Sequence, residues 1–111
     1  MSELNRSPLL LDPSTSALLV VDVQEKLLPL VQRSSDLLAN VTLLMDAAAR
    51  FDVPVVATEQ YPAGLGKSVP AVSQRLTQAA CEKRMFSCRE CHEVFTEWHA
   101  QRRRQVVVVG I

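Results

Sequence analysis

The sequence has no excess of charge of either sign. Its 111 residues include 12 Lys plus Arg and 12 Asp plus Glu, so the formal net charge is zero at pH 7. Without an overall field, the chain has no general attraction for nucleic acid or for an anionic membrane, and we expect neither partner. We interpret the dense basic run Arg102–Arg104 as cations at the carboxyl end of a helix, where the helix dipole favours them.

Long apolar runs are also missing. Nowhere do roughly 18 apolar residues follow one another, and the polar N-terminus lacks the apolar stretch of a signal sequence. Cysteine is scarce, because Cys81, Cys88 and Cys91 are the only three. An odd and small number fits reduced thiols better than a disulfide framework. The sequence therefore predicts a cytoplasmic protein with free thiols.

Apolar segments of two kinds alternate along the chain. Short runs at 17–23, 55–58, 80–83 and 106–109 have the length of strands, and the valine run at 106–109 is typical of a strand buried on both faces. Helical spacing follows Ser34 and Ser35, covers 70–79, and resumes after Ser87. This alternation predicts an α/β fold with a three-layer, Rossmann-like, doubly wound parallel sheet. We expect residues 1–15 to be a polar lead-in and residues 16–111 to form the domain.

Two helix starts carry capping signals. Ser34 and Ser35 precede the first helical segment, and serine accepts bonds from free amides at a helix N-terminus. Ser87 and Glu90 have the spacing of a capping box. The helix that this box opens is expected to carry Val94, Phe95 and Trp98 on one face.

The sequence stops directly after the valine run, at Gly110 and Ile111. A strand buried on both faces needs a crossover helix after it, and chemistry in open parallel sheets gathers just beyond the carboxyl ends of strands. We therefore expect a fragment that lacks its C-terminal βα units. Its uncovered valine strand should make the isolated chain aggregate or fold only marginally.

Two short motifs imitate ligand sites. Gly66–Ser68 has the ending of a phosphate-binding loop, but Tyr61 stands where that loop needs its first glycine and Pro62 removes a backbone donor. Cys88–His92 matches the pattern for haem attachment and, in part, a thiol redox pair. We interpret the first as a surface loop and Cys91 as a half-buried packing residue, and we leave a redox role open.

Two charged residues stand where parallel sheets place active sites. Asp22 follows an apolar run at the end of the first strand, and Lys83 ends the short third strand. A buried acid is costly unless it has a partner or a task. The carboxyl ends of parallel strands share one edge, so this carboxylate and this ammonium are expected to meet there. A structural ion pair and a turn cap remain as alternatives to catalysis.

Four ordered segments, Leu18–Gln24, Val53–Pro62, Glu82–Ser87 and Gln105–Ile111, resemble the isochorismatase-like cysteine hydrolase family. The resemblance implies that Asp22 and Lys83 are two of three catalytic groups. It also implies that the third, a nucleophilic cysteine, lies beyond Ile111, so that the 111 residues alone are inactive.

The implied reaction is hydrolysis of an amide or related C–N bond of a small molecule through a thioester, although the family also includes vinyl-ether hydrolysis. Gln24, Leu27 and Phe86 are implied as substrate-binding residues. Homo-oligomers are common in the family and are expected of the full-length protein.

Metal-binding members of the family carry Asp-x-His after the second strand, where this chain has Glu59–Tyr61. The resemblance therefore implies no cofactor and no metal, and it makes nicotinamide a less favoured substrate. Cys81, two residues before Lys83, is the nearest substitute for the nucleophile, but the family gives that position no such role.

Two other functions compete with a hydrolase. One is a non-catalytic binding or assembly module in which Asp22 and Lys83 form only a buried ion pair. The other is a phosphotransferase of the haloacid dehalogenase type with Asp22 as nucleophile, which expects a second acid where Gln24 stands.

Overall fold

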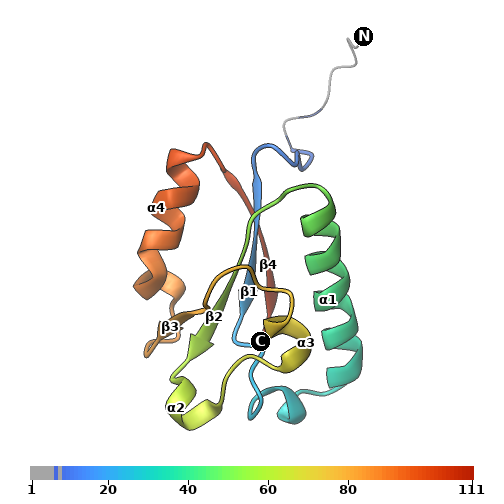
Figure 1. The fold of residues 1–111 in the computed structure, drawn as a ribbon, viewed down its shortest axis with the longest axis vertical. Coiled ribbons are helices and arrows are strands. Elements are labelled where there is room, and N and C mark those ends of the chain that lie inside the picture. Colours follow the sequence, from blue (N-terminus) through green and yellow to red (C-terminus); the bar gives the residue numbers. More distant parts are fainter. Residues whose placement is uncertain (1–6, 8) are drawn as a thin grey trace.

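The computed structural model describes residue 7 and residues 9–111, and it consists of a parallel sheet between two helical layers (Figure 1). The strands are β1 (Ser16–Val21), β2 (Val55–Gln60), β3 (Cys81–Lys83) and β4 (Gln105–Gly110). Their order across the sheet is β3-β2-β1-β4, and every pairing is parallel. The α/β fold class expected from the alternating pattern is thereby confirmed. We call the edge formed by the carboxyl ends of these strands the carboxyl rim.

The helical segments are η1 (Leu28–Leu30), α1 (Ser34–Arg50), α2 (Pro62–Leu65), α3 (Pro70–Ser73), η2 (Cys88–Cys91) and α4 (His92–Ala100). The helix expected over 70–79 ends early, at Ser73. Over the described part of the chain, no helix has the length and apolar character needed to span a bilayer.

Alternate residues of β1 pack into two separate hydrophobic cores, one on each face of the sheet. Leu18 and Val20 pack with Met45 of α1 on one face, whereas Ala17 and Leu19 pack with Trp98 of α4 on the other. Successive side chains of a strand point to opposite faces, so a strand that is apolar at every position requires cover on both sides. Figure 1 shows α1 and α3 on one side of the sheet and α4 on the other.

The hydrogen bonds at the two predicted helix starts differ from those that the sequence predicted. Arg33, not a serine, is the N-cap of α1, and it makes no side-chain capping bond. Ser87 Oγ does accept from the Arg89 amide at 3.1 Å. Glu90, however, does not return to Ser87, because its Oε1 accepts from the amides of Arg84 and Met85 in the preceding loop. The capping-box expectation was therefore half wrong.

β4 is covered on one face only. Val107 and Val109 pack toward α1, whereas Val106 and Val108 are 38% and 62% exposed. This exposure agrees with the expectation that the valine strand is uncovered in these residues, because Trp98 of α4 packs over β1 and β2 instead. The edge of the sheet that β4 forms is therefore apolar, and among the described residues no further strand pairs with it.

The basic run Arg102–Arg104 follows the end of α4, as expected for cations at a helix terminus. Arg103 has a more specific task, because its guanidinium donates to the carbonyls of Pro13 and Ser16. These bonds tie the end of the α4 layer to the start of β1.

We predict that Val108→Thr weakens self-association of the chain. Threonine keeps a β-branched shape but removes apolar area from the exposed face of β4, where unpaired strand edges promote association. Sedimentation velocity over a concentration series measures this, and the thermal midpoint should not fall.

Val109→Thr is the matched control. Because Val109 packs against the α1 core, the new hydroxyl should lower the free energy of unfolding by about 1–3 kcal/mol. A Val108→Thr chain that associates as strongly as the parent, or a parent that sediments as a monomer with a sharp cooperative melt, contradicts the expectation.

Candidate functional site

Asp22 is the first residue after β1, and its backbone has a φ of 54°. A residue other than glycine in this left-handed region costs of order 1–3 kcal/mol and persists only where its surroundings fix it. Here the carboxylate is fixed by two donors. Thr58 Oγ1 donates to Asp22 Oδ1 at 2.8 Å, and Lys83 Nζ donates to Asp22 Oδ2 at 2.9 Å.

The Lys83 ammonium is buried completely and is surrounded by acceptors. Besides the Asp22 carboxylate, it lies 2.8 Å from Gln60 Oε1, 3.3 Å from the Met85 carbonyl and 3.2 Å from the Phe86 carbonyl. A buried charge is tolerated only when it is paired and hydrogen-bonded, and both conditions are met. The structure thus brings Asp22 and Lys83 together, as expected from their positions at the carboxyl ends of parallel strands.

Gln24 is fully buried and holds the loop that follows β2. Its Nε2 donates to the carbonyls of Gln60 and Gly66, at 2.9 and 2.6 Å, and its Oε1 accepts from the Gln60 amide at 2.7 Å. Both amide hydrogens are therefore used by backbone groups of this chain. Its predicted role in substrate binding stays a prediction, and its observed role is to fix Gln60.

The other two expected pocket residues differ in exposure. Leu27 is half-buried at the start of η1. Phe86 is 90% exposed, and only its carbonyl faces the Lys83 ammonium. Their roles in substrate binding also stay predictions.

Sequence reasoning missed three residues of the site: Thr58, Gln60 and Glu59. Thr58 and Gln60 are two apart on β2, so they share a face, and both contact the ion pair. Glu59 points away and accepts from the Ser68 amide at 2.7 Å, which anchors the same loop. Three consecutive polar residues on a buried strand were the available signal.

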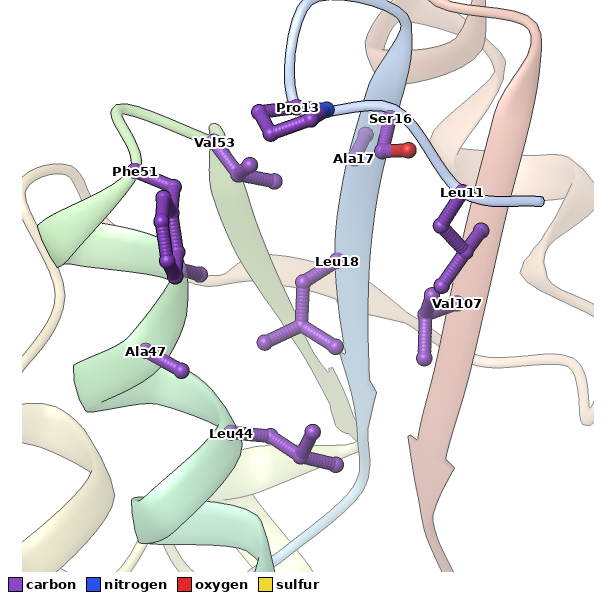
Figure 2. A pocket seen from close by; sticks show the side chains of 11 residues that line it. Leu11, Pro13, Ser16, Ala17, Leu18, Leu44, Ala47, Phe51, Val53 and Val107 are labelled. Atoms are coloured by element: carbon purple, nitrogen blue, oxygen red, sulfur yellow. The ribbon is translucent and has the colours of Figure 1, made fainter. Parts of the chain in front are cut away.

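Two cavities of about 280 Å³ flank the sheet at opposite ends. One has a mixed polar and apolar lining that includes Lys83, Tyr61, Glu82 and Glu90. The other is apolar and lies between α1 and the start of β1, with Phe51 among its walls (Figure 2). Of these two cavities, only the first is lined by a residue of the ion pair, Lys83, so it marks the candidate site.

The cysteines differ from expectation. Cys81 of β3 and Cys91 of η2 form a disulfide, with their Cα atoms 6.2 Å apart, and Cys88 is free. The prediction of reduced thiols is wrong for this pair, and Cys91 is 1% exposed rather than half-buried. The physical reason is that the chain folds back after β3, which brings two residues ten apart within disulfide range.

Gly110 brings the end of β4 close to Asp22. It has a φ of 125°, and a Cβ there would lie 2.2 Å from the Val21 carbonyl oxygen. Ile111 then donates to that same oxygen at 2.9 Å. The chain therefore passes directly over the residue that precedes Asp22.

We predict that Gly110→Ala destabilises the fold. The methyl group collides with backbone rather than with a movable side chain, and the positive φ adds strain. A loss of at least about 1–3 kcal/mol in the free energy of unfolding is expected by urea titration. An alanine variant as stable as the parent would show that this approach is not a constraint.

We also predict strong coupling between Asp22 and Lys83. Asp22→Asn or Lys83→Met each leaves a buried charge unpaired, and each should cost about 3–5 kcal/mol of stability. The double variant should cost clearly less than the sum, as measured by a urea double-mutant cycle.

Asp46→Asn is the control for that cycle. Asp46 also pairs with a cation, and the hydrogen bond from Arg75 holds the pKa of its carboxyl below the usual value, but this pair is exposed. Little change is expected there. Additive effects of Asp22→Asn and Lys83→Met would contradict the predicted coupling.

Comparison with known sequences finds that the model of the isochorismatase domain matches residues 16–111. Isochorismatase domain-containing protein 2 of Danio rerio is 40% identical over 55 residues, a match that covers 50% of this chain and 28% of that protein.

Solved structures agree with the sequence match. MAR1 ribonuclease from Caenorhabditis elegans superposes with a TM-score of 0.77 at 31% identity, covering 90% of this chain and 52% of its own. YcaC from Escherichia coli, described as an octameric hydrolase of unknown specificity, gives 0.80 at 25% identity, covering 96% and 54%. YcaC from Pseudomonas aeruginosa, solved with hexane-2,5-diol and covalent acrylamide, gives 0.75 at 30% identity, covering 96% and 55%. The chain thus spans about half the length of these solved structures.

Proposed function

This chain belongs to the isochorismatase family, and we propose from that premise that it is the N-terminal part of a cysteine hydrolase. The observation that carries the proposal is the buried ion pair between Asp22 and Lys83 at the carboxyl rim. In open parallel sheets, ligands bind outside the carboxyl ends of the strands. The nucleophilic cysteine is proposed to come from sequence after Ile111, in agreement with relatives that are about twice as long.

The proposed reaction cleaves an amide or related C–N bond of a small molecule. The cysteine thiol gives its proton to the Asp22 carboxylate, and the Lys83 ammonium favours the thiolate that results. The thiolate attacks the carbonyl carbon, the leaving amine takes the proton, and a thioester remains. Asp22 then deprotonates a water molecule that hydrolyses the thioester.

Two relatives support parts of this proposal. The YcaC structure from Pseudomonas aeruginosa carries covalent acrylamide, and acrylamide is an electrophile of the kind that thiolates attack. The YcaC structure from Escherichia coli is described as octameric, which supports a homo-oligomer for the full-length protein. We further propose a cytoplasmic location and a pocket completed by Leu27 and Phe86, with Gln24 fixing the loop beside it.

The test uses the full-length protein with a panel of small amides. We expect an acyl adduct on one cysteine by intact-mass spectrometry, and we expect Asp22→Asn to lower kcat by about 10²–10⁴-fold because it removes the proton acceptor. Asp46→Asn, with its exposed carboxylate, should leave kcat unchanged.

Short RNA substrates belong in the same panel, because one structural relative is described as a ribonuclease. RNA cleavage without acyl transfer would contradict the hydrolase proposal. Full turnover by the 111 residues alone would contradict the proposed position of the nucleophile. A folded full-length protein with neither activity would favour the binding-module alternative.

We predict that a chelator leaves the hydrolase activity unchanged. Positions 59–61 are Glu, Gln and Tyr, so the Asp-x-His motif of metal-binding members is not present there. Dialysis against a strong chelator, followed by the amide assay, measures this. Activity that is lost on dialysis and restored by a divalent cation would overturn the metal-free proposal.

A further inference from the structure

Three cysteines lie at the two ends of the loop that follows Lys83. Cys81 and Cys91 are bonded to each other, and Cys88 is a free, half-buried thiol. Cys88 and Cys91 are the first and last residues of η2, a 3-10 helix, and side chains three apart on such a helix lie on the same side. Cys88 packs against the core cluster that contains Trp98. The free thiol therefore lies on the side of the helix that carries a disulfide sulfur.

The segment between the bonded cysteines is held mainly by polar contacts. Glu90 Oε1 accepts from the Arg84 and Met85 amides at 2.9 and 2.6 Å, and Gln60 Nε2 donates to the Arg84 carbonyl at 2.9 Å. The Lys83 ammonium donates to two further carbonyls of the segment. The side chains of Met85 and Phe86 are exposed, so apolar burial adds little to its order. The disulfide between Cys81 and Cys91 joins the two ends of this segment covalently.

We propose that Cys81, Cys88 and Cys91 form a thiol–disulfide exchange site that controls the order of the loop following Lys83. In the exchange step, the Cys88 thiolate attacks Cys91 Sγ. The Cys88–Cys91 bond forms, the Cys81–Cys91 bond breaks, and Cys81 leaves as a thiolate that takes up the proton Cys88 released. No outside oxidant is consumed in this step.

Complete reduction needs a small thiol such as glutathione. Two such thiols become one disulfide, and Cys81 and Cys91 become thiols. Either exchange or reduction unties β3 from η2, so the loop loses its closure and the Lys83 ammonium loses fixed carbonyl partners. Disulfides of cytoplasmic proteins are usually transient and redox-sensing or catalytic, which agrees with such a role.

This site goes beyond the proposed hydrolase, because thiol states and loop order are measured without any turnover. The protein is equilibrated in glutathione buffers from fully reduced to fully oxidised. Free thiols are blocked, the disulfides are reduced and labelled with a second reagent, and peptides are identified by mass spectrometry. Loop order is followed as the rate of trypsin cleavage after Arg84, with cleavage after Arg50 as an internal control.

We expect both the Cys81–Cys91 and the Cys88–Cys91 pairs in oxidised protein, and reduction of both within the glutathione range. Reduction should speed cleavage after Arg84 by roughly tenfold or more, and should leave cleavage after Arg50 unchanged, because only the closed loop is released. Cys88→Ser should remove the second pair alone. Cys81→Ser should leave only Cys88–Cys91 and give fast cleavage after Arg84 in every buffer.

A Cys81–Cys91 bond that resists every glutathione ratio overturns the exchange site, and so does failure to find Cys88 in any disulfide of the parent. Equal rates of trypsin cleavage after Arg84 in the oxidised and the reduced protein overturn the proposal that the thiol state controls the order of the loop. If Cys81→Ser does not fold, the disulfide pairs of the parent and of Cys88→Ser still test the exchange. These two proteins differ only in whether Cys88 is able to form a disulfide.

Discussion

The fold depends on one interaction, the buried ion pair between Asp22 and Lys83. Asp22 directly follows β1 and Lys83 ends β3, and these two strands are not neighbours, because β2 lies between them. The pair therefore crosses the sheet at its carboxyl rim, and β2 must supply polar side chains under it. Thr58 satisfies the carboxylate and Gln60 satisfies the ammonium. Removing any of these groups leaves a buried polar atom without its partner, which costs more than the bond itself contributes.

The same pair explains why polar groups extend along the rim. Gln60 holds the ammonium, and Gln24 in turn holds Gln60 on both its amide and its carbonyl. The loop after β3 also closes on the ammonium through its carbonyls. The disulfide joins β3 to η2 across that loop, and Cys81 and Lys83 are two residues apart on β3. This arrangement is the basis of the proposed link between the thiol state and the ion pair.

The sequence predicted the strands, the parallel sheet and the meeting of Asp22 with Lys83. These features follow from apolar periodicity and from the shared edge of parallel strands. Thr58 and Gln60 were missed because polar residues at a strand end have the same pattern as solvent-facing ones. The disulfide was missed because it depends on how the chain returns after β3.

We propose that a cysteine from sequence after Ile111 completes the site formed by Asp22 and Lys83. A crystal structure of the full-length protein tests it most directly. We expect a cysteine Sγ, from a segment after Ile111, within about 4 Å of the Asp22 carboxylate or the Lys83 ammonium. A rim that holds no cysteine, with the ion pair closed off by other residues, would contradict this proposal.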